Sequence, residues 1–297
     1  MGSHDLFESL LDYTGSYVRL RHYAAATRRG YLTDQLLFVR FLKAQYGVSR
    51  IDEVERRHIV DYLTHAERRG LRGTTIARKL AALRSLFTYL VEDGRITSSP
   101  VRGIPPPKQE WAQPRVLSQI EYGRLKAAAE RDPRARAIVE IFLQTGIRLS
   151  EAAQLRVEDV VLPEAQELPS IGLLRVWGKG RKERSVTPNS KACQALSAYL
   201  TTRTAYDKHA PLFASKYGAS LTPRSIQRIV AKLTADARVA RASVHTLRHT
   251  FATHTVRKGT NLRVVQEALG HSSLHTTSRY VSLARELMDE QLEANAL

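Results

Sequence analysis

The chain has 297 residues, 46 Lys and Arg against 29 Asp and Glu, and a formal net charge of +17 at pH 7. A folded protein with this excess usually binds a polyanion, most often nucleic acid, although a basic protein without such a partner is the alternative. The single cysteine excludes an intrachain disulfide and a four-cysteine zinc site. We find no signal-peptide pattern and no apolar run of about 20 residues, so we expect a cytoplasmic protein without a membrane segment.

Three helices are predicted in the first hundred residues, at 26–47, 54–70 and 74–94, because apolar residues recur there at helical spacing. A threonine N-cap is expected at the start of the third helix, and Gly94 at its end. Arg72, Arg78, Lys79 and Arg84 lie on or beside this helix. They either form a solvated face or contact DNA phosphates, and we take them as candidate DNA contacts.

Five prolines, at 100, 105, 106, 107 and 114, interrupt the helical pattern. Proline removes a backbone donor and favours extended chain, so no continuous helix can cross this region. We therefore predict a linker over residues 101–116, which separates a helical domain at 1–100 from a second domain at 117–297.

The second domain is predicted to be mainly helical. Helices are expected in residues 135–146, 149–160, 221–237, 243–259 and 261–270, and a last one from about residue 273 to the C-terminus. Ser150, Thr222 and Asn261 are the expected N-caps, and the helix at 243–259 is expected to begin at Ser243. Residues 171–188 predict a strand, a glycine-bearing turn and a strand. The fold class is therefore mainly α with a small β-hairpin (α+β).

Three places in this domain carry side chains suited to a phosphodiester. Arg148 lies between two predicted helices, where backbone N–H groups and a guanidinium together can hold a phosphate oxygen. Lys179 lies at the hairpin tip between two glycines. His245 and Arg248 share a helix face and could bind an anion and transfer a proton. Arg148 and Lys179, each taken alone, are better explained as ordinary surface residues. His245 and His249 could hold zinc, but the HExxH motif and a cysteine ligand are absent, so no metal is expected.

Four segments follow one another in a recognisable order: QTGIRLSEAAQLRVEDV, VWGKGRKERSVTP, SVHTLRHTFATHTVRKG and VVQEALGHSSLHTTSRYV. With them the chain resembles the tyrosine recombinase (phage integrase) family, over nearly its whole length. Its size and layout are similar to the Xer and transposon-resolvase members. The resemblance implies a core-binding (SAM-like) domain at 1–100, a catalytic domain at 117–297, and a two-domain, C-shaped clamp around DNA.

The resemblance assigns roles to four residues directly involved in the reaction. Tyr280 matches the nucleophile, and Arg148 and Arg248 match the arginines that clamp the scissile phosphate. Lys179 matches the lysine that protonates the leaving 5′ oxygen. The chemistry is consistent: guanidinium groups stabilise the extra negative charge of the transition state, and the basic leaving oxygen requires an acid. A tyrosine hydroxyl, with an ordinary pKa of about 10, requires a base or a strongly cationic pocket.

Further residues complete the implied site. His245 matches the histidine of the HxxR motif, and His271 the position held by histidine or tryptophan. Glu151 matches the acidic residue that supports the first arginine. Arg181, in the hairpin turn with Lys179, joins the candidate DNA contacts. Neither a metal nor another cofactor is expected, because the cations of the site supply the positive charge and the phosphotyrosine conserves the bond energy.

The function implied is site-specific recombination of double-stranded DNA with paired half-sites, through a 3′-phosphotyrosine and a Holliday junction. A homotetramer on DNA, or a heterotetramer with a second recombinase, would carry it out, with the C-terminal helix docked on a neighbouring protomer. Dimer or cointegrate resolution and the integration or excision of a mobile element remain open. Two alternatives are a type IB topoisomerase, against which the core-binding-like N-terminal half argues, and a DNA-binding regulator without activity.

Overall fold

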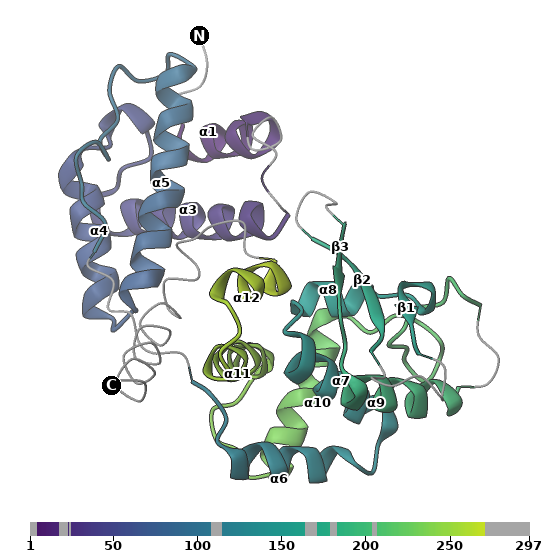
Figure 1. Cartoon of the computed structure of the whole chain (residues 1–297). Coiled ribbons are helices and arrows are strands. Elements are labelled where there is room, and N and C mark those ends of the chain that lie inside the picture. The colour runs from purple at the N-terminus through teal and green to yellow at the C-terminus, as the bar shows by residue number, and fades with distance from the viewer. Residues whose placement is uncertain are drawn as a thin grey trace. The chain divides into compact units, whose positions relative to one another are not determined.

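The computed structural model describes residues 5–17, 23, 25–107, 115–163, 171–178, 183–203 and 207–270. The chain forms two compact units, Met1–Ala112 and Gln113–Leu297 (Figure 1). It is mainly helical with one small antiparallel sheet, so the predicted fold class is confirmed. Among the helices in the described ranges, none has the length and apolar character needed to cross a membrane.

The first unit is entirely helical in its described part. Its elements are α1 (Leu6–Asp12), a π-helical turn η1 (Tyr13–Tyr17), α3 (Ala25–Tyr46), a 3-10 turn η2 (Ile51–Glu53), α4 (Arg56–Arg68) and α5 (Gly73–Glu92). The core between α3, α4 and α5 is aromatic and aliphatic, and the rings of Phe38 and Phe87 meet edge to face at 6.3 Å. Val101 and Ile104 also belong to this core, so the start of the proline-rich segment packs on the first unit.

Two predicted helix caps are wrong. Helix α5 begins at Gly73 with Arg72 as N-cap, because the first turn closes when Thr75 N–H donates to the Arg72 carbonyl at 2.8 Å. Helix α8 (Leu149–Gln154) begins after Arg148, and Ser150 therefore lies inside the helix. Its start is set by Glu151, whose carboxylate accepts from the Arg148 N–H at 2.7 Å, the bond by which an acidic third residue caps a helix.

The second unit contains eleven described elements. They are α6 (Gln119–Ala129), α7 (Pro133–Thr145), α8, a 3-10 turn η3 (Val157–Asp159), β1 (Val160–Val161), β2 (Leu173–Trp177), β3 (Glu183–Val186), α9 (Ser190–Thr201), α10 (Pro223–Asp236), α11 (Val244–Arg257) and α12 (Leu262–Leu269). The predicted starts at Thr222, Ser243 and Asn261 are confirmed, since each side chain accepts a backbone N–H of its own first turn. The predicted last helix lies outside the described residues.

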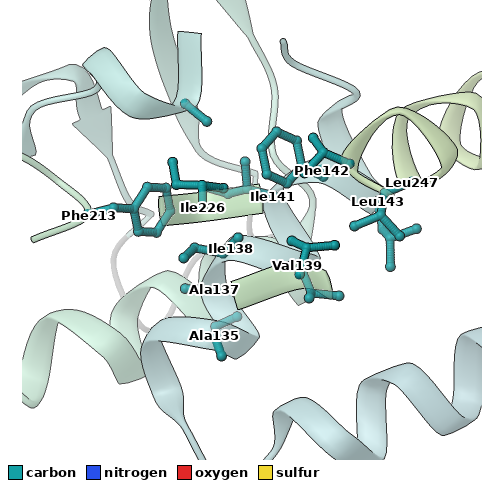
Figure 2. Packing of buried hydrophobic residues seen from close by; sticks show 14 of the residues in the cluster. Ala135, Ala137, Ile138, Val139, Ile141, Phe142, Leu143, Phe213, Ile226 and Leu247 are labelled. Atoms are coloured by element: carbon teal, nitrogen blue, oxygen red, sulfur yellow. The ribbon is translucent and has the colours of Figure 1, made fainter. Parts of the chain in front are cut away.

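Helix α7 forms the centre of the second unit and is packed against α6, α9, α10 and α11. Figure 2 shows its side chains, among them Ile138, Ile141 and Phe142, surrounded by Phe213, Ile226 and Leu247 of other elements. A helix that is apolar on nearly all sides must be buried. Because α7 is fixed on every side, the turn that follows it at Gly146 is held in place too.

The sheet has the order β1-β2-β3, and both pairs are antiparallel. The predicted hairpin is β2 and β3, with Leu174 opposite Val186 and Val176 opposite Arg184. Strand β1, which pairs Val160 with Leu174, was not predicted; it has two residues, too few for an alternating pattern. In β3, Arg184 is on the same side of the sheet as buried Val186, since side chains alternate along a strand.

Candidate active site

The turn between α7 and α8 presents Arg148. Gly146 ends α7 in the left-handed conformation (φ 61°), and a Cβ there would lie 2.4 Å from Cδ1 of Phe251. Only glycine fits, because the backbone conformation and the lack of space both exclude a side chain. Arg148 follows with extended backbone as the N-cap of α8. The predicted position of Arg148 between two helices is confirmed.

Glu151 lies under this arginine and is almost completely buried, with 2% of its side chain exposed. Its carboxylate accepts from the Arg148 backbone N–H at 2.7 Å and from Arg148 Nη1 at 3.0 Å. It also accepts from Arg184 Nη1 at 2.6 Å and from Arg184 Nη2 at 2.9 Å. Burial by itself raises the pKa of Glu151, but the bonds from Arg184 and Arg148 outweigh it and leave the pKa below its usual value. Glu151 is therefore a buried anion at neutral pH.

Arg184 was not predicted as a site residue. It lies on β3, and 18% of its side chain is exposed. The alternation of the strand could have indicated its role. A residue two positions before Val186 faces the same buried side of the sheet, and an arginine on that side requires a hydrogen-bond acceptor. The sequence does not identify that acceptor, because Glu151 precedes Arg184 by 33 residues and belongs to a helix.

Arg248 approaches the same place from α11 and is buried, with 9% exposed. It donates through Nη1 to the Gly146 carbonyl and through Nη2 to the Leu269 carbonyl, the latter at 2.8 Å. Arg148 Nη2 donates to the next carbonyl, that of Gly270. The two arginines that sequence analysis paired are thus joined through the turn after α7 and the C-terminal end of α12.

Gly270 lies directly against these guanidinium groups. Its backbone is left-handed (φ 62°), and a Cβ would lie 2.7 Å from Cζ of Arg184 and 2.9 Å from Nη1 of Arg148. We call Arg148, Glu151, Arg184 and Arg248 the arginine cluster. In it, the guanidinium groups of Arg148 and Arg184 share one carboxylate, and Arg248 donates to two backbone carbonyls nearby. Two cations on one carboxylate leave positive charge in excess, which favours binding of an anion such as a phosphate.

The other predicted site residues fall into two groups. His245 is exposed on α11, one turn before Arg248 and on the same helix face. Lys179, Arg181, His271 and Tyr280 lie outside the described residues.

The four candidate DNA contacts of the first unit differ from one another. Arg72 is exposed. Lys79 is buried: its Nζ lies 3.1 Å from Asp34 Oδ1 and 3.0 Å from the Tyr62 hydroxyl. Arg78 also pairs with Asp34, and Arg84 donates to the carbonyl of Ile104. Lys79 therefore has its charge engaged inside the unit, whereas Arg72 presents its charge to solvent.

Comparison with known proteins agrees with the geometry. Residues 115–286 match the phage integrase family, and residues 12–94 match the phage integrase N-terminal SAM-like domain. The tyrosine recombinase XerC of Thermodesulfovibrio yellowstonii is 37% identical over 86% of this chain and 84% of its own length. The tyrosine recombinase XerD of Listeria monocytogenes is 30% identical over 95% of both chains.

Solved structures show the same fold. The XerH site-specific recombinase bound to difH substrate in a pre-cleavage complex superposes with a TM-score of 0.70, at 25% identity over 91% of this chain and 79% of that one. A λ integrase tetramer bound to a Holliday junction superposes with a TM-score of 0.73 over 92% of this chain and 76% of that one; at 18% identity it supports the fold alone. The resemblance found in the sequence is confirmed: the chain belongs to the phage integrase family of tyrosine recombinases, and its relatives are Xer recombinases.

Proposed function

We propose that this protein is an Xer-like site-specific recombinase that cleaves and rejoins DNA strands through Tyr280. The observation that carries the proposal is the arginine cluster, in which Arg148, at the start of α8, and Arg248, from α11, converge, and Arg148 and Arg184 share a single carboxylate. A phosphodiester transition state carries added negative charge on its non-bridging oxygens, and guanidinium groups fixed in advance stabilise that charge as it develops.

In the proposed reaction, the Tyr280 hydroxyl gives its proton to a base, for which His245 is the candidate, and its oxygen attacks the scissile phosphorus and forms a 3′-phosphotyrosine bond. The bond from phosphorus to the 5′ oxygen breaks, and Lys179 gives the leaving oxygen its proton. A 5′ hydroxyl from a partner strand then attacks the phosphotyrosine, and the tyrosine oxygen leaves. His245, on the same helix face as Arg248, and His271 would hold protons and hydrogen-bond the phosphate oxygens. Glu151 would keep Arg148 in position.

We further propose that the protein acts on paired half-sites in double-stranded DNA as a tetramer, with a Holliday junction as intermediate. λ integrase, a protein of the same fold, has been solved as such a tetramer bound to a Holliday junction. Both units would contact the duplex, with residues 1–100 as core-binding domain, 101–116 as linker and 117–297 as catalytic domain. The C-terminal helix would dock on a neighbouring protomer. Arg72 and Arg181 are the proposed DNA contacts. Arg78 and Arg84 would also contact DNA, through guanidinium N–H groups that do not bond Asp34 or the Ile104 carbonyl.

Trapping of covalent complexes tests this function. Oligonucleotides from a library of palindromic sites, nicked next to each candidate phosphate, release a short 5′ fragment after cleavage and so prevent rejoining. Wild-type protein should accumulate a DNA adduct that survives denaturation, whereas Tyr280→Phe should bind the same DNA and form none. Adducts that persist in Tyr280→Phe would contradict the assignment. Relaxation of a supercoiled plasmid that lacks the selected site would point instead to a topoisomerase.

A further inference from the structure

We propose that Arg184 is a positioning residue of the active site, which holds the Glu151 carboxylate and thereby keeps the guanidinium of Arg148 available to the scissile phosphate. This inference rests on the proposed function, because it concerns the same phosphate site. It adds a residue from the sheet to the residues for which the sequence suggested a role.

The contacts make Arg184 the main partner of Glu151. Its two terminal nitrogens reach the two carboxylate oxygens at 2.6 and 2.9 Å, a bidentate arrangement, whereas the Arg148 side chain reaches a single oxygen at 3.0 Å. The bidentate geometry is the stronger of the two. A carboxylate offers about four acceptor positions. Together with the Arg148 backbone N–H, these bonds fill them.

This distribution of bonds determines what Arg148 can do. Because Arg184 takes two of the acceptor positions, the Arg148 side chain contacts Glu151 through Nη1 alone and is not drawn into a bidentate pair, while its Nη2 donates to the Gly270 carbonyl. Of the two arginines that bond Glu151, removal of Arg184 would leave Arg148 to balance the buried carboxylate. The guanidinium would then turn toward Glu151, and its charge would be neutralised there rather than directed at a phosphate.

Arg184 also joins three parts of the second unit. It comes from β3, opposite Val176, and its partner Glu151 belongs to α8. The guanidinium carbon lies where a Cβ of Gly270, just after α12, would be 2.7 Å away. The Nε of Arg184 is buried and has no hydrogen-bond acceptor among the described residues. A buried donor without an acceptor lowers stability, so stability alone does not explain an arginine here.

The test uses the nicked DNA selected by trapping, with either a normal phosphate or a methylphosphonate at the scissile position. The methylphosphonate lacks one negative oxygen, so a residue that acts by stabilising phosphate charge matters less on it. Arg184→Gln should slow adduct formation on phosphate DNA by about 10- to 100-fold, by analogy with the loss when a residue that orients a metal ligand is removed. On methylphosphonate DNA the loss should shrink several-fold, in parallel with that of Arg148→Ala.

Arg175→Gln is the matched control, since Arg175 lies on the neighbouring strand, opposite Ser185, and donates to the Glu158 carbonyl, away from the arginine cluster. This control should change the rate of adduct formation by no more than a small factor on either phosphate or methylphosphonate DNA. Arg184→Lys keeps the charge but cannot form the bidentate pair, so it should show an intermediate loss with the same dependence on substrate charge. Thermal melting of each variant identifies any that fails to fold, in which case Arg184→Lys carries the test.

Two results would overturn the inference. One is an Arg184→Gln rate equal to that of Arg175→Gln, and the other is a loss of the same size on both substrates, which would indicate a structural role. Failure of the proposed function is distinguishable from both, because the wild-type protein would then form no adduct on either DNA.

Discussion

Two clusters of charge, one in each unit, are built around a buried carboxylate and differ in how many cations converge there. In the first unit, Lys79 and Arg78 meet Asp34, and Lys79 also donates to Tyr62; we call these four residues the lysine cluster. Only 7% of the Lys79 side chain and 2% of that of Asp34 are exposed. In the arginine cluster three guanidinium groups converge, and two of them, those of Arg148 and Arg184, share the carboxylate of Glu151.

The difference indicates what each cluster does. The lysine cluster joins α3, α4 and α5 by neutralising its most buried charges locally, and it offers little to a ligand. Burial raises the pKa of the Tyr62 hydroxyl, and the bond from Lys79 opposes that shift only in part, so Tyr62 stays neutral. In the arginine cluster the guanidinium groups of Arg148 and Arg184 share the one carboxylate of Glu151, and Arg248 converges on the same place, an arrangement suited to binding an anion.

The largest effect is expected from Lys79→Met. Breaking a buried ion pair on one side costs about 3–5 kcal/mol, and because Arg78 still pairs with Asp34 we expect the lower end of that range. Urea unfolding measures the loss. The double variant with Asp34→Asn should recover part of it, since no buried charge is then left. Unchanged stability combined with weaker DNA binding would show that Lys79 is the DNA contact that the sequence suggested.

Arg148→Ala should have the opposite profile. Adduct formation should fall by about 10²- to 10³-fold, the loss typical of a group that stabilises transition-state charge. Binding of the same DNA should change only a few-fold, because many other phosphate contacts remain. Single-turnover rates and a gel-shift titration separate the two quantities. Equal losses in rate and affinity would mean that Arg148 is only a binding residue.

A smaller effect, about 10-fold on adduct formation, is expected for Gly270→Ala. The left-handed conformation costs about 1–2 kcal/mol for a residue with a side chain, and the new methyl group would also displace Arg184 and Arg148. Gly259→Ala is the matched control, because Gly259 is also left-handed (φ 81°) but has open space around it. Similar stability but different cleavage rates in the two variants would support the contact with the guanidinium groups. Equal cleavage rates would refute it.

The smallest effect concerns acid stability. The pKa of Glu151 is lowered in the folded protein, so its contribution to stability is complete above the unfolded pKa of about 4.3 and is lost as pH falls through the lower folded pKa. The wild-type free energy of unfolding should therefore decrease more steeply below about pH 4 than that of Glu151→Gln. Urea unfolding across this pH range measures both slopes. Parallel slopes would show that Glu151 does not have a lowered pKa.

Much of the fold and part of the site could be predicted from the sequence. Periodicity and caps located most long helices, since Thr222, Ser243 and Asn261 act through bonds within one turn. Ser150 failed as a cap because Glu151, three residues after Arg148, competes for the same helix start. The role of Arg184 and the ion pair of Lys79 could not be predicted, because each depends on a carboxylate from a distant segment, Glu151 for Arg184 and Asp34 for Lys79. Such pairings are decided by packing, which a local pattern does not contain.

The most direct test of the account is to identify the residue that becomes linked to DNA. Wild-type protein is trapped on the selected nicked DNA in the presence of a metal chelator, digested with protease and nuclease, and analysed by mass spectrometry. We expect the nucleotide mass on the peptide that contains Tyr280, attached through a 3′ phosphate. An adduct on another residue, or strand cleavage without protein-linked DNA, would contradict the account.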